Sequence, residues 1–139
     1  MAKNFNYDDV PVVETTGGSL KGFFYEGAYI YRGVPYAYAD RFQMPEEAAW
    51  EGVKDATSYG FVCPLMNQDT PGAELMVPHR YWPQDEHCQS LNIWTNKLDP
   101  EAKKPVLVWF HGGGYAAGYG FPCAKLLYVY GHLRWAYLF

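Results

Sequence analysis

Short apolar and β-branched runs separated by glycine dominate the first part of the chain. Three of these runs cover Val10 to Thr16, Leu20 to Tyr25 and Ala28 to Arg32, with Gly17-Gly18 and Glu26-Gly27 between them. Short β-prone runs joined by glycine-containing turns are typical of strands that pair in sequence order. The pattern therefore predicts an antiparallel meander at the N-terminus.

Proline interrupts the strand pattern after this meander. The segment Gly33 to Ala37 is expected to end the third strand, because Pro35 has no N–H group to give to a sheet. Residues 41–84 contain five prolines and are predicted to be mostly loop, with one helical turn at Glu46 to Trp50. Leu91 to Thr95 is a further strand candidate.

The most apolar strand candidate is Val106 to Phe110, which stands between Pro105 and a glycine-rich turn. Five consecutive apolar residues predict a strand that is buried on both faces. The turn occupies residues 111–114 and has the sequence H-G-G-G. Glycine has no Cβ, so the backbone N–H groups of such a turn can approach a ligand closely. Converging N–H donors at the end of a strand would stabilise a developing oxyanion.

Composition predicts a globular chain and argues against nucleic acid as a partner. The 139 residues are 49% hydrophobic and 19% aromatic, enough for one domain with a sizeable core. The formal net charge is −4 and there is no block of Lys or Arg. No apolar run reaches the roughly 18–20 residues of a membrane span, and Met1 to Val10 lacks the apolar segment of a secretory signal. We therefore expect a cytoplasmic protein without a membrane partner.

The three cysteines are Cys63, Cys88 and Cys123. An odd number without a secretory signal favours free thiols. A bond between Cys63 and Cys88 is geometrically plausible, and closing that loop would add about 3–4 kcal/mol in the chain-entropy model. No cluster of cysteine and histidine has the spacing of a zinc site, so a metal is not expected.

Five blocks of sequence between residues 33 and 118 occur in a particular order. They are Gly33 to Ala37; Arg41-Phe42; a block made of Trp50, Gly52-Val53, Asp55 to Thr57, Tyr59-Gly60 and Cys63; Glu86 to Trp94; and Pro105 to Gly118. In this order and spacing they resemble the N-terminal part of the type B carboxylesterase family, which includes the cholinesterases. The block from Glu86 resembles the family signature E-D-C-L-x-L-N-I. His87 and Gln89 stand where the family has Asp and Leu, so hydrogen bonding there is expected to differ.

The resemblance implies an α/β fold. It would be the N-terminal portion of an α/β-hydrolase fold, in which an antiparallel meander leads into the central mixed sheet, truncated relative to the family. Residues 1–120 would form the N-terminal part of the carboxylesterase domain, and residues 121–139 an atypical aromatic tail. In the family the H-G-G-G turn contributes the oxyanion hole. Backbone N–H groups of Gly113 and Gly114 would be the donors, and His111 and Gly112 would have structural roles.

The resemblance further implies a carboxylic-ester hydrolase that acts on small-molecule esters through a serine nucleophile and an acyl-enzyme, without cofactor or metal. That nucleophile sits in a G-x-S-x-G elbow, with the acid and the base further along. The only serines are Ser19, Ser58 and Ser90, and none lies in such an elbow. The chain would carry the oxyanion turn but no nucleophile, acid or base, and is expected to be inactive alone. Two alternatives are a non-catalytic cholinesterase-like binding domain and an inactive fragment from a truncated or frameshifted reading frame.

Overall fold

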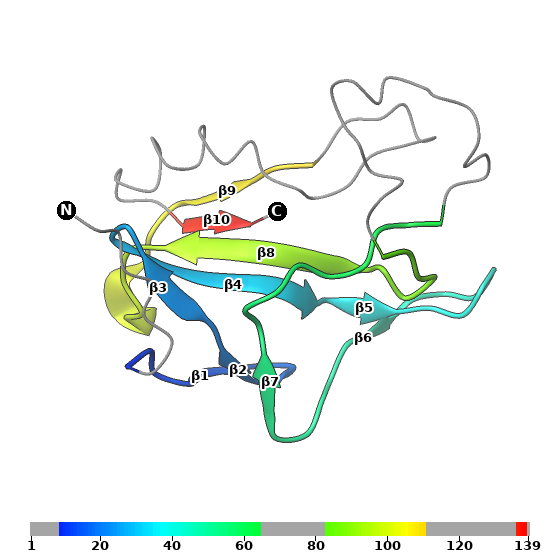
Figure 1. Ribbon diagram of the computed structural model, residues 1–139, viewed down its shortest axis with the longest axis horizontal. Coiled ribbons are helices and arrows are strands. Elements are labelled where there is room, and N and C mark those ends of the chain that lie inside the picture. The colour runs from blue at the N-terminus through cyan, green and yellow to red at the C-terminus, as the bar shows by residue number, and fades with distance from the viewer. Residues whose placement is uncertain (1–8, 65–82, 111–135, 139) are drawn as a thin grey trace.

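The chain forms three β-sheets in the computed structural model, which describes residues 9–64, 83–110 and 136–138 (Figure 1). The sheets have the strand orders β1-β2-β7, β3-β4-β8-β10-β9 and β5-β6. The strands are β1 (Val13–Thr15), β2 (Gly18–Lys21), β3 (Phe23–Tyr25), β4 (Ala28–Pro35), β5 (Ala37–Tyr38), β6 (Glu46–Glu47), β7 (Val53–Asp55), β8 (Ser90–Thr95), β9 (Val106–Val108) and β10 (Ala136–Leu138). A 3-10 helix, η2 (Pro100–Ala102), precedes β9.

The N-terminal runs form two hairpins in different sheets. β1 pairs with β2 and β3 pairs with β4, both antiparallel, but β2 and β3 belong to separate sheets. Gly22 lies between β2 and β3 and divides the run from Leu20 to Tyr25. A Cβ at this position would lie 2.1 Å from the carbonyl oxygen of Ile30. Glu26 and Gly27, with φ of 49° and 85°, make a two-residue turn of the kind that suits the twist of a hairpin.

β4 contains a bulge and extends further than the sequence predicts. Its register with β8 shifts between Tyr31 and Val34, and Gly33 within the bulge has a φ of 59°. The Gly33 N–H donates to Oδ1 of the buried Asn92 at 2.9 Å, which ties the bulge to β8. The bulge lets the strand continue to Pro35, whose missing N–H is tolerated at the last position.

The helical turn expected at residues 46–50 is wrong. Its first two residues form β6, which pairs with β5. The Trp50 N–H, which a helical turn would bond to the Glu46 carbonyl, donates instead to the carbonyl of Gly17 at 2.8 Å. The Ala48 N–H donates to the carbonyl of Tyr36 at 3.3 Å. Pairing with distant backbone therefore outweighs the local preference for a helix.

Two apolar clusters lie on either side of the β4–β8 pair. One contains Phe23, Ala28, Ile30 and Trp94, and the other contains Leu20, Tyr31, Val34 and Ala56. Successive side chains of a strand point to opposite faces, so neighbouring β4 residues contribute to different clusters. The expected strand at Leu91 to Thr95 is confirmed as β8, which pairs antiparallel with β4.

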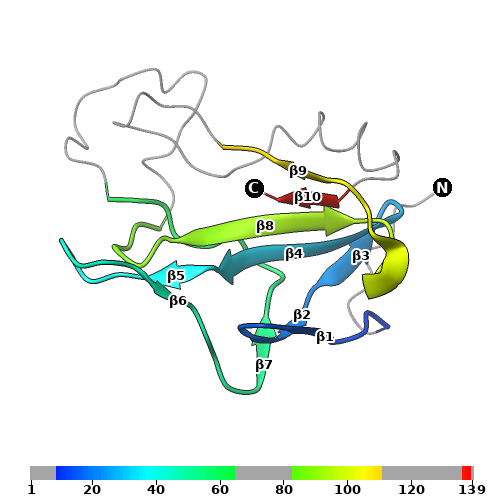
Figure 2. The same cartoon turned by 180° about the vertical axis from the view of Figure 1, so that it is seen from behind.

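The strand expected at Val106 begins as predicted but differs in burial. β9 is the terminal strand of the described five-stranded sheet, and Val106, Leu107 and Val108 are 55%, 45% and 48% exposed. β10 lies between β8 and β9, antiparallel to the first and parallel to the second. Figures 1 and 2 place β9 and the β1-β2-β7 sheet on opposite sides of the β4–β8 pair. The expectation of burial on both faces is therefore wrong for this structure, because β9 contributes no residue to either apolar cluster of the described residues.

Candidate active site

The predicted oxyanion turn follows directly from the edge of the larger sheet. β9 leads through Trp109 and Phe110, which are exposed, into residues 111–114. The predicted donors Gly113 and Gly114, together with His111 and Gly112, lie outside the described residues. Their roles stay predictions, and the structure describes the strand that leads to them.

Hydrogen bonds fix the connection that enters β9. The Asp99 carboxylate caps η2 by accepting from the Glu101 N–H at 3.0 Å, and it also accepts from the Lys97 ammonium at 2.7 Å. The Lys97 hydrogen bond, followed by the Glu101 bond, lowers the pKa of Asp99. Lys104 Nζ donates to the Asn96 side chain. The start of β9 is thus held to the end of β8.

The corner before β8 contains the two departures from the family signature. The His87 N–H donates to Asp85 Oδ1 at 2.8 Å, and the His87 ring makes an edge contact with Tyr38, the ring centroids being 6.2 Å apart. Gln89 Nε2 donates to the Glu86 carbonyl at 3.4 Å, while Gln89 Oε1 is buried without a partner. These contacts give both side chains structural roles at the corner.

An exposed ion pair also belongs to this corner. Arg41 Nε donates to Glu86 Oε2 at 3.3 Å, and an Arg41 terminal nitrogen contacts the other carboxylate oxygen. It joins two of the blocks that carry the family resemblance. The pair links the loop after β5 to the segment before β8.

The three serines do not form a catalytic arrangement within the described part of the chain. Ser19 Oγ donates to both carboxylate oxygens of Glu14 at 2.8 Å. Ser58 lines a surface pocket, and Ser90 Oγ would lie 2.3 Å from a Cβ added to Gly60. No serine–histidine hydrogen bond and no metal-binding group of three or more side chains occurs among residues 9–64, 83–110 and 136–138.

Cys63 and Cys88 are free thiols that lie near one another. Burial, followed by the neighbouring Cys63, raises the pKa of the Cys88 thiol. Cys63 Sγ contacts the carbonyl oxygen of Pro64 at 3.7 Å. The third cysteine, Cys123, lies outside the described residues. The disulfide between Cys63 and Cys88 stays a prediction.

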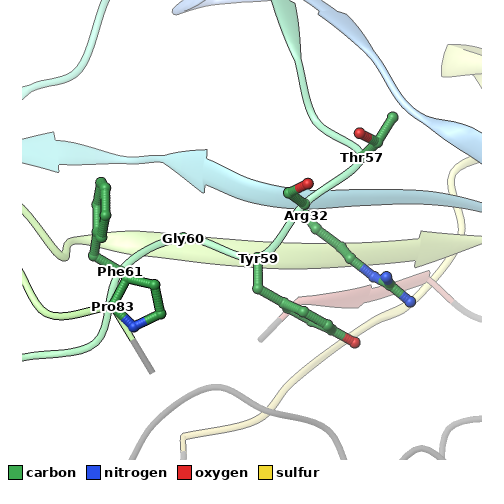
Figure 3. Close-up of a pocket in the computed structure, with 7 residues that line it drawn as sticks. Arg32, Thr57, Tyr59, Gly60, Phe61 and Pro83 are labelled. Carbon is green, nitrogen blue, oxygen red and sulfur yellow. The ribbon is translucent and has the colours of Figure 1, made fainter. Parts of the chain in front are cut away.

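The structure also contains a pocket that the sequence analysis did not predict. The guanidinium of Arg32 in β4 lies over the rings of Phe23 and Tyr59. Arg32 and Tyr59 both line a cavity of about 280 Å³ (Figure 3). Burial raises the pKa of the Tyr59 phenol, and the charge of Arg32 opposes that rise. The signal that could have indicated the pocket is a single arginine within the apolar run from Ala28 to Val34.

Comparison with known proteins finds a family match that includes all five sequence blocks described above. The sequence model of the carboxylesterase family matches residues 9–129. The chain belongs to the carboxylesterase family. Phenmedipham hydrolase from Pseudarthrobacter oxydans is 41% identical over 115 residues, which are 79% of this chain and 23% of that protein. Acetylcholinesterase from Gallus gallus is 36% identical over 124 residues, covering 78% of this chain and 16% of that protein.

Solved structures of carboxylesterases share the fold of this chain. An esterase from Clostridium hathewayi, described as able to hydrolyse aliphatic aromatic polyesters, is 51% identical with a TM-score of 0.83. The match covers 99% of this chain and 28% of that one. The Geobacillus stearothermophilus carboxylesterase is 33% identical with a TM-score of 0.71, covering 91% and 25%. The chain therefore corresponds to a strand-rich part of an α/β-hydrolase fold and spans under a third of these relatives.

The helices of the described residues were compared with the length and apolar character of a membrane span. In the described segments, no helix combines the length and the apolar character needed to cross a bilayer.

Proposed function

We propose that the intact protein hydrolyses carboxylic esters through an acyl-enzyme, and that this chain contributes the oxyanion turn. The observation that carries the proposal is the family match over residues 9–129, which includes the H-G-G-G turn. The named relatives include an esterase of polyesters and a hydrolase of phenmedipham. Small ester substrates are the class that these relatives support.

In the proposed mechanism, a serine attacks the ester carbonyl and the carbonyl oxygen becomes negatively charged. The backbone N–H groups of Gly113 and Gly114 donate hydrogen bonds to this oxyanion, while His111 and Gly112 hold the turn. Donors already in place cost no reorganisation as charge develops, which is the reason for their large effect. The nucleophile, acid and base come from outside these 139 residues.

A chimaera tests the proposed role of the turn. Residues 9–118 replace the matching segment of the phenmedipham hydrolase, and nitrophenyl ester turnover is measured. Gly114→Pro removes one N–H donor and is expected to lower kcat by about 10²–10³-fold. Gly114→Ala keeps the N–H and is the matched control. Equal activity of the proline variant and the parent chimaera would exclude Gly114 as a donor.

The chain alone is expected to be inactive. A fluorophosphonate probe reacts with activated serines, and none of the three serines lies in an elbow. We expect no stoichiometric labelling and no turnover of a short-chain nitrophenyl ester. Labelling of Ser19, Ser58 or Ser90 would contradict this expectation.

A further inference from the structure

Arg32 is held between two aromatic rings at the β4 bulge. Its Cζ atom lies 4.8 Å from the centre of the Phe23 ring and 4.3 Å from the centre of the Tyr59 ring. Stacking fixes the plane of a guanidinium and removes part of its hydration. The Arg32 backbone N–H donates to the carbonyl oxygen of Ala56 at 2.7 Å, so this residue also joins β4 to the loop after β7.

The positive charge of Arg32 has no carboxylate partner in the described residues. The Nε atom is buried and makes no hydrogen bond. Two ion pairs join described residues to one another, Arg41 with Glu86 and Lys97 with Asp99, and neither involves Arg32. Arg32 as a whole is half-buried, but a buried donor such as its Nε is normally satisfied in proteins. An unsatisfied Nε beside a cavity therefore indicates an anion that these residues do not provide.

The cavity beside Arg32 has both polar and apolar walls. Its volume is about 280 Å³, near the lower end of the range of small-molecule pockets. The side chains of Arg32 and Tyr59 extend in the same direction, while Phe61, further along the loop, lies beside Pro83 of the segment that leads to β8 (Figure 3). The lining residues are Arg32, Thr57, Ser58, Tyr59, Gly60, Phe61 and Pro83. Such walls suit a ligand with a charged end and an apolar body.

Close backbone packing fixes the loop that forms the cavity. A Cβ added to Gly33 would lie 2.8 Å from both Gly60 N and the Ser58 carbonyl oxygen. A Cβ added to Gly60 would lie 2.3 Å from Ser90 Oγ. The loop therefore lies directly against β4 and β8 at positions where only glycine fits. A site built in this way is preorganised, which lowers the entropic cost of binding.

We propose that this pocket binds a small carboxylate, with the Arg32 guanidinium donating hydrogen bonds to the carboxylate oxygens. The planar fork of a guanidinium matches the two oxygens of a carboxylate. The apolar part of the ligand packs against Phe61 and Pro83. The site uses no residue of the oxyanion turn, so it does not depend on the proposed hydrolysis.

Titration of the complete 139-residue chain tests the proposal. Sodium benzoate and the neutral, isosteric benzamide are added separately, and the ¹H–¹⁵N resonance of Arg32 Nε is followed. We expect a saturable shift with benzoate and at least about tenfold weaker binding of benzamide, because hydrogen bonds between charged groups contribute the difference. Arg32→Gln is expected to weaken benzoate binding by about tenfold or more. The matched control, Arg41→Gln, removes one positive charge outside the pocket and leaves binding unchanged.

Three results overturn the proposal: no saturable shift with benzoate, equal affinities for benzoate and benzamide, or undiminished benzoate binding in Arg32→Gln. Near-UV circular dichroism shows whether Arg32→Gln retains its fold. If that variant does not fold, the comparison of benzoate with benzamide on the unaltered chain still decides.

Discussion

The strands around β4 and the strand β9 contain similar apolar residues in opposite environments. Phe23, next to β4 along the sheet, is 1% exposed, while Phe110 after β9 is 86% exposed. Phe23 belongs to β3, and β3 and β9 are the two terminal strands of the described five-stranded sheet, each pairing with one neighbour. Apolar composition is therefore insufficient for burial. Packing in the cluster with Ala28, Ile30 and Trp94, and not the number of paired edges, makes Phe23 part of the core.

The largest effect expected from this difference comes from truncating each phenylalanine. Phe23→Ala removes a fully buried ring from the Ile30–Trp94 cluster and should lower the free energy of unfolding by about 3–5 kcal/mol. The matched variant Phe110→Ala should change it by less than about 0.5 kcal/mol. Urea unfolding followed by circular dichroism measures both. A similar loss in the two variants would show that β9 is packed as tightly as β4.

A disulfide between Cys63 and Cys88 would strengthen the β8 side of the molecule further. Closing this loop should raise the free energy of unfolding by about 3 kcal/mol, seen as a higher Tm that dithiothreitol reverses. The raised pKa of Cys88 disfavours its thiolate, so oxidation should speed up as the pH rises. Cys88→Ser is the control and should gain no stability under the same oxidation. An unchanged Tm in the oxidised parent chain would refute the disulfide.

Substitution of Gly33 tests how closely the loop after β7 packs on β4. An added Cβ would meet backbone atoms at 2.8 Å, and the φ is 59°, so Gly33→Ala should cost about 2–3 kcal/mol. Gly52 also has a positive φ, 72°, but nothing lies within 4 Å of an added Cβ. Gly52→Ala should therefore cost only about 1 kcal/mol, from backbone strain alone. Equal losses in the two thermal melts would mean that steric contact at the bulge has no part.

Substitution of Tyr31 tests whether its buried hydroxyl destabilises the core cluster around Leu20. The residue is 3% exposed and its hydroxyl has no hydrogen-bond partner. Tyr31→Phe should therefore raise the free energy of unfolding by about 1 kcal/mol. Tyr29→Phe, which removes a hydroxyl from a less buried tyrosine of the same strand, is the control. A destabilised Tyr31→Phe would reveal a bonded hydroxyl.

The same tyrosine should also give a pH dependence. Burial, with a contribution from Tyr29, raises the pKa of Tyr31 to about 12, above the roughly 10 of an unfolded tyrosine. The folded state then holds its proton where the unfolded state loses it, so this contribution to stability is complete below about pH 10 and is lost as the pH rises toward 12. Urea titrations at about pH 9 and about pH 11 measure the free energy of unfolding, which should fall less between these two pH values in Tyr31→Phe than in the parent chain.

The smallest effect on stability is expected at the exposed strand. Leu107 is 45% exposed on β9, so Leu107→Lys should change the free energy of unfolding by less than about 0.5 kcal/mol. It should nevertheless reduce self-association, because a charge on an edge strand opposes pairing with other chains. Val12→Lys is the control, since Val12 is 44% exposed away from β9. Light scattering that is unaltered by Leu107→Lys would show that this edge does not associate.

Sequence reasoning succeeded where the signal is local. The turn after β3 and the strand β8 follow from glycine chemistry and from a run of strand-forming residues, both visible within a few positions. β7 could not be predicted in this way, because its three residues pair in parallel with β2, where Val53 aligns with Ser19. Such short strands have no periodicity of their own, and their partners are distant in sequence.

The functional residues show the same difference between local and distant signals. Gly113 and Gly114 were predicted from a contiguous motif and stay predictions. The pocket at Arg32 depends on Phe23 and Tyr59, which come together only after β4 pairs with β3 and the loop after β7 folds against the bulge. A lone arginine in an apolar run hints at a buried charge, but the sequence does not indicate its neighbours.

The position of β10 also has a consequence for the order of folding. The β3–β4 hairpin can close as soon as Ala28 and its neighbours are synthesised, whereas Val106 of β9 waits for Ala136. During synthesis at about 5–20 residues per second, β9 leaves the ribosome before the strand that links it to β8. Its apolar side chains are then accessible to chaperones or to other nascent chains for seconds. The rate at which β10 arrives, as much as the stability of its pairing with β8 and β9, would therefore affect the yield of folded protein.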